Sequence, residues 1–84
     1  PAYDNQGQLA FRQEDYDEAE AMFRKALDLK PDMADSKYYL GRIAEIKGDS
    51  EMAAAFYHAA ARSRITGMNT VSREEVDKKS QAYS

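Results

Sequence analysis

The sequence contains no cysteine, only two prolines and only four glycines in 84 residues. Without cysteine, neither a disulfide framework nor a thiolate metal site can form. The compartment stays open, because cysteine-free chains occur in the cytoplasm and the periplasm alike. The glycines are dispersed along the chain, so they form no phosphate-cradling loop. We therefore expect neither a metal nor a cofactor.

Histidine is nearly absent as well, since His58 is the only one. A histidine–carboxylate–nucleophile arrangement or a histidine-containing metal site would have to use it, and no spacing in the chain favours either. Because His58 directly follows an aromatic position of the expected core, we predict that it lies on the surface. The sequence predicts no enzyme activity.

Long apolar runs are also missing. No segment approaches the roughly 20 apolar residues that a membrane-spanning helix needs, and no signal-peptide pattern stands at the start. The net charge is −3, with acidic and basic residues interspersed, which argues against binding a nucleic-acid backbone. The chain begins at Pro1 without a methionine, so we expect a fragment of a larger protein. Its localisation is not predicted.

What the sequence does contain is a repeat with a period of 34 residues. Six residues recur unchanged at this spacing: Gly7 and Gly41, Ala10 and Ala44, Asp15 and Asp49, Ala19 and Ala53, Ala21 and Ala55, Ala26 and Ala60. Three further positions match conservatively: Leu9 with Ile43, Met22 with Phe56, and Phe23 with Tyr57. A fixed period of this length is typical of a helical array, in which each unit buries its apolar face against its neighbours.

The hydrophobic periodicity predicts an all-α chain. Apolar and small residues recur at steps of three and four, which favours helices near 2–13, 16–29, 34–47, 50–64 and 71–83. Asp15 is placed to cap the second helix, Pro31 to end it, Gly48 to end the third and Asp49 to cap the fourth. The result is two antiparallel helix pairs followed by one further helix.

Taken as a set, these positions resemble the tetratricopeptide repeat family. The matching residues are Tyr3, Gly7, Tyr16, Ala19, Phe23, Ala26 and Pro31 in the first repeat, and Leu40, Gly41, Gly48, Ala53, Tyr57 and Ala60 in the second. The resemblance covers about residues 2 to 65. It implies an α-α superhelix, with one repeat over 1–33, a second over 34–67 and a C-terminal capping helix over 68–84.

Small and aromatic residues account for the packing that such a fold requires. We expect Gly7 and Gly41 to let two helix backbones approach closely, while Phe23 and Tyr57 fill the space between helix pairs. We expect Ala19 and Ala53 to allow the same close approach of the helix backbones, because their side chains are small.

The expected fifth helix differs from the others in composition. Glu74 with Lys78 and Glu75 with Lys79 are i, i+4 pairs in the favourable order, and its apolar content is low. One interpretation is a cap that covers the exposed edge of the second repeat. The alternative is a docking or dimerisation arm.

The resemblance also implies a partner-binding face. In family members, the inner face of the first helix of each repeat lines a concave groove that holds a peptide. On this chain that face comprises Asp4, Gln8, Phe11 and Arg12 from the first repeat, and Asp35, Tyr38, Tyr39, Arg42 and Glu45 from the second. Tyrosine and arginine are enriched at binding hot spots. The alternative is that Phe11 and Tyr39 pack between helices and that the charges are merely solvated.

The function expected from this resemblance is recognition of a protein or peptide partner in the concave groove, without catalysis. Two alternatives remain open at this point. The exposed faces of the repeats could stack against a second copy to form a homo-dimer, or the array could serve as an accessory scaffold domain attached to an enzyme.

Overall fold

The computed structural model describes residues 3–63 and 73–83, and it contains five helices in these ranges. They are α1 (Tyr3–Arg12), α2 (Tyr16–Leu29), α3 (Ala34–Ile46), α4 (Ser50–Arg62) and α5 (Arg73–Ala82). Every bound lies within two residues of the range predicted from hydrophobic periodicity. The expected loop over 65–70 and the first two positions of the predicted fifth helix lie outside the described residues.

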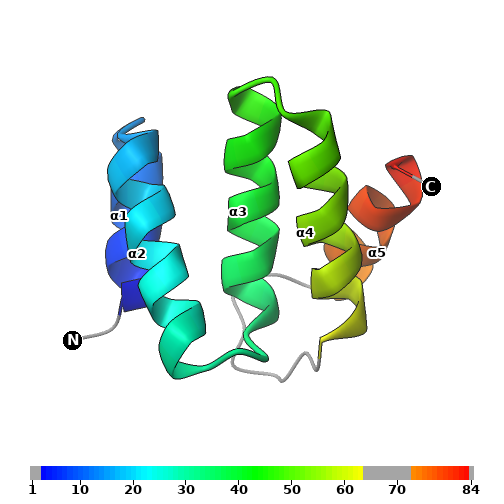
Figure 1. Cartoon of the computed structure of the whole chain (residues 1–84), viewed down its shortest axis with the longest axis horizontal. Helices are drawn as coiled ribbons and strands as arrows, with labels where there is room; N and C mark the ends of the chain where they lie inside the picture. Colours follow the sequence, from blue (N-terminus) through cyan, green and yellow to red (C-terminus); the bar gives the residue numbers. More distant parts are fainter. Residues whose placement is uncertain (1–2, 64–72, 84) are drawn as a thin grey trace.

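The helices form two antiparallel pairs that stand side by side, as Figure 1 shows. α1 packs against α2, α3 packs against α4, and α2 and α3 join the two pairs. α5 lies against α4, at the edge of the second pair. This confirms the predicted all-α architecture of two helix pairs and a further helix.

Local sequence signals account for where α2 and α4 begin. The carboxylate of Asp15 accepts a hydrogen bond from the backbone N–H of Glu18 at 3.4 Å, and Asp49 accepts one from Met52 at 3.1 Å. Each bond satisfies one of the backbone donors that a helix start leaves unpaired. At the other end of α2, Lys30 precedes Pro31 and adopts a non-helical conformation, with φ −137° and ψ 85°.

The turn between α1 and α2 and the turn between α3 and α4 have the same backbone form. Asp15 N–H donates to Ala10 C=O at 2.9 Å, and Asp49 N–H donates to Ala44 C=O at 2.8 Å. The residue before each aspartate is left-handed, with φ 62° at Glu14 and 83° at Gly48. Glycine adopts this conformation without steric cost, whereas glutamate does not.

Close backbone approach occurs at the two glycines predicted for it. A Cβ atom on Gly7 would lie 2.9 Å from the Phe23 ring, and one on Gly41 would lie 2.7 Å from the Tyr57 ring. Real Cβ atoms are almost never this close to another heavy atom. Phe23 and Tyr57 are both completely buried. The repeat therefore reflects one packing solution used twice.

The buried side chains form two clusters, one at each junction along the array. Ala10, Ala19, Phe23, Leu40 and Ile43 join the first pair to α3. The second cluster joins α3 and α4 to α5, and its members are Tyr38, Ala44, Ala53, Tyr57, Ala60 and Val76. Val76 is completely buried, so α5 covers part of the second pair.

Candidate partner-binding surfaces

The nine residues predicted for the partner-binding face differ in exposure. Arg12 is exposed, and Asp4, Phe11, Tyr39, Arg42 and Glu45 are half-buried. Gln8, Asp35 and Tyr38 are buried, with 8%, 3% and 6% of their surface exposed. These three residues of the predicted face are therefore not open to a partner in this structure, because their side chains are buried.

Neighbouring helices explain the burial of Tyr38. This residue packs in the same cluster as Val76, so α5 covers it. Burial raises the pKa of the Tyr38 hydroxyl, and a hydrogen bond with Glu75 of α5 adds to the effect. Gln8 lies on α1 one helical turn before Phe11 and Arg12, so only part of the predicted face reaches solvent.

Four of the predicted residues do come together, and we call Phe11, Arg12, Tyr39 and Arg42 the arginine–aromatic cluster. The Phe11 ring meets the Tyr39 ring edge to face, with centroids 5.4 Å apart. The Arg42 guanidinium lies over the Phe11 ring, 5.0 Å from its centroid. Such cation–π geometry holds the guanidinium at a fixed place on the surface.

Tyr39 anchors the cluster in the core. Its ring stacks on Phe23, with centroids 5.1 Å apart and planes within 2° of parallel. Burial raises the pKa of its hydroxyl, while the positive charges of Arg42 and Arg12 act in the opposite direction. The alternative of Phe11 and Tyr39 packing between helices is therefore correct in part, because both residues are half-buried and their rings contact each other and the core.

The two arginines of this cluster carry charge that no carboxylate among the described residues neutralises. Within residues 3–63 and 73–83, neither Arg12 nor Arg42 forms an ion pair with a carboxylate. A guanidinium presents donors in a planar fork that matches a carboxylate, so this surface suits an acidic ligand group.

Glu45 has a different role, at a site we call the glutamate junction: Glu45, Tyr57, Lys79 and Tyr83. The Glu45 carboxylate accepts hydrogen bonds from the hydroxyl of Tyr57, from the hydroxyl of Tyr83 at 2.6 Å and from the Lys79 ammonium at 3.2 Å. Side chains of α4 and α5, and Tyr83 just beyond α5, thus meet at one carboxylate of α3. Glu45 contributes to the docking of α5, and it is not free for a partner in this arrangement.

Electrostatics support the ionised state of this carboxylate. Burial alone would raise the pKa of Glu45, but the hydrogen bonds from Tyr57, Tyr83 and Lys79 outweigh it and hold the pKa below its ordinary value. Burial and the bond to Glu45 both raise the pKa of Tyr57, so its hydroxyl remains a donor. Lys79 and Tyr83 were not among the predicted site residues. The sequence does carry one signal for this junction: Tyr57 stands in the second repeat where Phe23 stands in the first. A buried tyrosine hydroxyl needs a hydrogen-bonding partner, which indicates polar residues nearby.

His58 lies on the side of α4 that faces α5. Its Nδ1 atom is 2.9 Å from the Ser80 hydroxyl, and the side chain is half-buried. The expectation of a surface histidine is therefore correct only in part, because the fifth helix covers one side of the imidazole. A substitution of His58 would affect the docking of α5.

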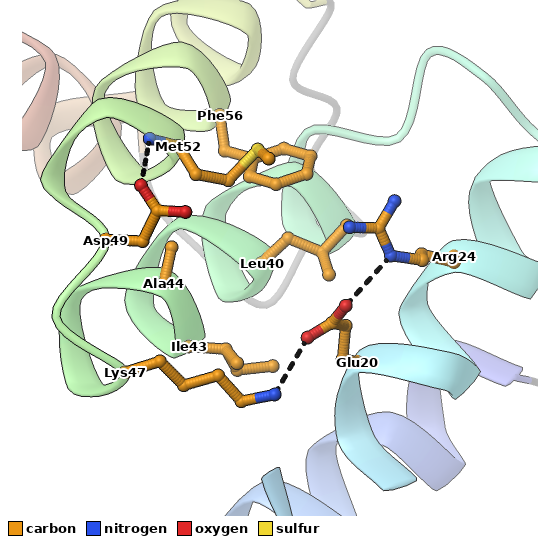
Figure 2. A pocket seen from close by; sticks show the side chains of 9 residues that line it. All are labelled: Glu20, Arg24, Leu40, Ile43, Ala44, Lys47, Asp49, Met52 and Phe56. Carbon is orange, nitrogen blue, oxygen red and sulfur yellow. Dashed lines mark hydrogen bonds and ion pairs between the residues drawn. The ribbon is translucent and has the colours of Figure 1, made fainter. Parts of the chain in front are cut away.

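On the outside of the array, a groove lies between α2 and α4, with α3 as its floor (Figure 2). Its volume is about 240 Å³, and it is lined by Glu20, Arg24, Leu40, Ile43, Ala44, Lys47, Asp49, Met52 and Phe56. Volumes of about 300–1,000 Å³ are usual for small-molecule sites, so this outer groove is small for that purpose.

The charged side chains at the rim of the outer groove are paired with one another. The Lys47 ammonium lies 2.7 Å from the Asp17 carboxylate and 3.0 Å from that of Glu20, and Glu20 also pairs with Arg24 at 3.2 Å. Hydrogen bonding to Lys47 lowers the pKa of the Asp17 and Glu20 carboxyls. In contrast to the arginine–aromatic cluster, this rim satisfies its own charges.

Residues 3–63 and 73–83 contain no group of three histidine, cysteine or acidic side chains arranged to hold a metal ion. The same ranges contain no helix that combines the length and the apolar character needed to cross a membrane.

Comparison with known proteins places this geometry in a family. A family model described as "Tetratricopeptide repeat" matches residues 5–67, which spans both helix pairs. The comparisons found no matching curated protein and no matching solved structure. Tetratricopeptide repeats generally mediate protein–protein interactions, and the family is typically non-catalytic.

Proposed function

Because the chain belongs to the tetratricopeptide repeat family, we propose that it binds an extended segment of a partner protein on the face made by α1 and α3. The observation that carries this proposal is the arginine–aromatic cluster. Arg12 and Arg42 lack carboxylate partners among the described residues, while Phe11 and Tyr39 offer half-buried rings beside them. A binding surface needs such unsatisfied groups, whereas the outer rim has paired its charges.

The chemistry of the cluster favours a partner segment that carries carboxylates next to an apolar or aromatic side chain. Each guanidinium can take one carboxylate in a bidentate pair. The Arg42 guanidinium is already positioned by the Phe11 ring, so less side-chain freedom is lost on binding. Aromatic and arginine side chains at the centre of an interface commonly dominate its affinity.

The proposed contact set is narrower than the nine residues predicted from sequence. It comprises Phe11, Arg12, Tyr39 and Arg42, with half-buried Asp4 on the same helix face as Arg12. Gln8, Asp35 and Tyr38 are buried and support the face from beneath. Glu45 is held by the glutamate junction.

Selection from a random peptide display library tests this proposal and requires no named partner. We expect the immobilised chain to enrich acidic peptides that contain an aromatic or aliphatic residue. Substitution of Arg12→Gln together with Arg42→Gln should weaken a selected peptide by about thirtyfold or more, since a hot-spot residue typically contributes about 2 kcal/mol or more.

The matched control is Arg24→Gln, which removes an arginine from the outer rim of the groove. It should leave peptide affinity unchanged, and both variants should keep the helical circular-dichroism signal and melting temperature. Equal loss of binding in the two variants would place recognition elsewhere, and enrichment without acidic residues would remove the proposed ligand chemistry.

One observation favours homo-oligomerisation as a second candidate function. Leu9 is 54% exposed, while its counterpart Ile43 in the second repeat is 1% exposed because it packs against the preceding helix pair. The outer edge of α1 therefore offers an apolar position of the kind that a second helix covers. Light scattering after size exclusion tests this, and a dimer that Leu9→Glu converts to a monomer would support stacking at this edge.

A further inference from the structure

α5 is held to the array mainly by polar contacts. Its hydrogen bonds to α3 and α4 include the Glu75–Tyr38 bond described above and Ser80 to His58 at 2.9 Å. Lys79 and Tyr83 also donate to Glu45, at 3.2 Å and 2.6 Å. Val76 is the only apolar side chain in the described part of this segment that is completely buried. Polar interfaces of this kind are typical of contacts that open and close, whereas permanent ones are more apolar.

The first junction of the array is built differently. There Phe11, Phe23 and Tyr39 meet ring to ring, and no hydrogen bond joins their side chains. Glu45 occupies the position of Phe11 in the second repeat, and Tyr57 occupies that of Phe23. Tyr83 contacts Tyr57 at a centroid distance of 5.6 Å, much as Tyr39 contacts Phe23 at 5.1 Å. At each junction a tyrosine thus packs on the buried ring, but at the second junction both tyrosines also hydrogen-bond to Glu45.

The surface beneath α5 has features of a receptor for a helix. It presents the face of Tyr57, the buried Tyr38 ring and a carboxylate that accepts three hydrogen bonds. Val76, Lys79 and Tyr83 are spaced i, i+3 and i+7, so they lie along one face of a helix. Recognition by such spaced anchors is a common mode of helix binding.

We propose that the edge of α3 and α4 beneath α5 is a helix-docking site, where a helix of another protein replaces α5. The incoming helix carries an apolar residue, a lysine three positions later and a tyrosine four positions after that. The lysine and the tyrosine reach Glu45, and the apolar residue takes the place of Val76. This proposal is independent of the arginine–aromatic cluster, since the two sites share no residue.

A fluorescein-labelled peptide with the sequence of residues 73–83 is the probe, titrated against the full 84-residue chain by fluorescence anisotropy. In the parent chain the attached α5 competes at a high effective concentration. Val76→Asp weakens that competitor, so this variant should bind the probe at least about tenfold more tightly than the parent. Adding Glu45→Gln to the variant should reverse the gain. A probe with both Lys79→Ala and Tyr83→Phe should bind at least about tenfold more weakly than the unaltered probe.

A second variant keeps the test decisive if Val76→Asp unfolds the chain. The chain lacks cysteine, so His58→Cys with Ser80→Cys introduces one thiol pair at a point where α4 and α5 touch. A short bis-maleimide then clamps α5 in place, and the clamped chain should bind the probe at least about tenfold more weakly than the same chain before cross-linking.

Equal binding before and after the clamp would overturn the proposal, because the probe would then bind outside the α5 site. The proposal would also be overturned if the probe bound neither the Val76→Asp variant nor the His58→Cys, Ser80→Cys chain before cross-linking. A concentration-dependent dimer in light scattering that the clamp abolishes would assign the site to α5 of a second copy, and would refute a separate protein partner. The arginine variants should leave probe affinity unchanged, so failure here is distinguishable from failure of the inner-face proposal.

Discussion

The two junctions of this array place different chemistry at positions that are equivalent in the repeat. At the first junction, between the first helix pair and α3, the Phe23 ring stacks on the Tyr39 ring, and the Phe11 ring meets the Tyr39 ring edge to face. At the second junction, between the second pair and α5, the equivalent positions are Tyr57 and Glu45, and the Glu45 carboxylate accepts hydrogen bonds from the hydroxyls of Tyr57 and Tyr83.

The difference shows how few atoms change the nature of a junction. A phenylalanine ring packs without needing a partner, whereas a buried tyrosine hydroxyl must find an acceptor. Glu45 supplies that acceptor and, once ionised and half-buried, recruits the Lys79 ammonium and a second hydroxyl. The first junction is therefore an apolar part of the core, and the second is a polar contact that depends on ionisation.

Substitution of the packing glycines should have the largest effect and should not distinguish the junctions. Gly7→Leu and Gly41→Leu each force a side chain into an aromatic ring 2.9 or 2.7 Å from the new Cβ. Overpacking of this kind costs about 1–3 kcal/mol or more, a large part of the stability of a small domain. Urea melts followed by circular dichroism measure it, with Ala21→Leu on the exposed side of α2 as control. An unchanged midpoint in either variant would contradict the close contact.

Exchange of one oxygen atom should separate the junctions. Phe23→Tyr places a hydroxyl beside Phe11, where no carboxylate stands, and should cost about 1–3 kcal/mol for an unsatisfied buried group. Tyr57→Phe removes a donor to Glu45 and should cost about 1 kcal/mol. Adding Phe11→Glu to Phe23→Tyr rebuilds the polar pair and should recover part of the loss. A double-mutant cycle in urea gives the coupling, and strict additivity would show that the pair is not the source of the difference.

The twin turns offer a smaller comparison. Glu14 and Gly48 stand at equivalent positions with positive φ, but only one of them is glycine. Glu14→Gly should therefore stabilise the chain by up to about 1 kcal/mol, and Gly48→Ala should destabilise it by a similar amount. For a domain of this size, that is a melting-temperature change of roughly 4–8 °C. A loss of stability in Glu14→Gly would mean that the glutamate side chain contributes more than its backbone strain costs.

The smallest expected effect is a pH dependence confined to the second junction. The folded state lowers the pKa of Glu45 below its ordinary value of 4.5, so the unfolded chain binds more protons as the pH falls. The stabilisation is complete above that ordinary value and is lost as the pH falls through the lower pKa of the folded state. The stability difference between parent and Glu45→Gln should thus shrink on acidification. The difference between parent and Phe11→Leu, at the aromatic junction, should stay constant. A constant difference for Glu45→Gln as well would refute the ionised junction.

Much of the fold follows from local patterns. The 34-residue period correctly predicted the close contacts at Gly7 and Gly41, because the Phe23 and Tyr57 rings lie so near these helices that a Cβ atom would clash with them. Capping aspartates, Pro31 and Gly48 correctly predicted helix ends, since each acts on backbone groups within a few residues. The partner-binding role of the inner face stays a prediction.

The sequence by itself determined where each helix begins and ends and which residues form the packed faces, because these depend on period, caps and side-chain size. Only the tertiary structure decided which inner-face residues stay accessible. Tyr38 is covered by α5, a helix more than 30 positions away in the chain, and Glu45 accepts from residues 12 to 38 positions distant. Exposure and ion pairing depend on such non-local neighbours, which no local pattern of residues specifies.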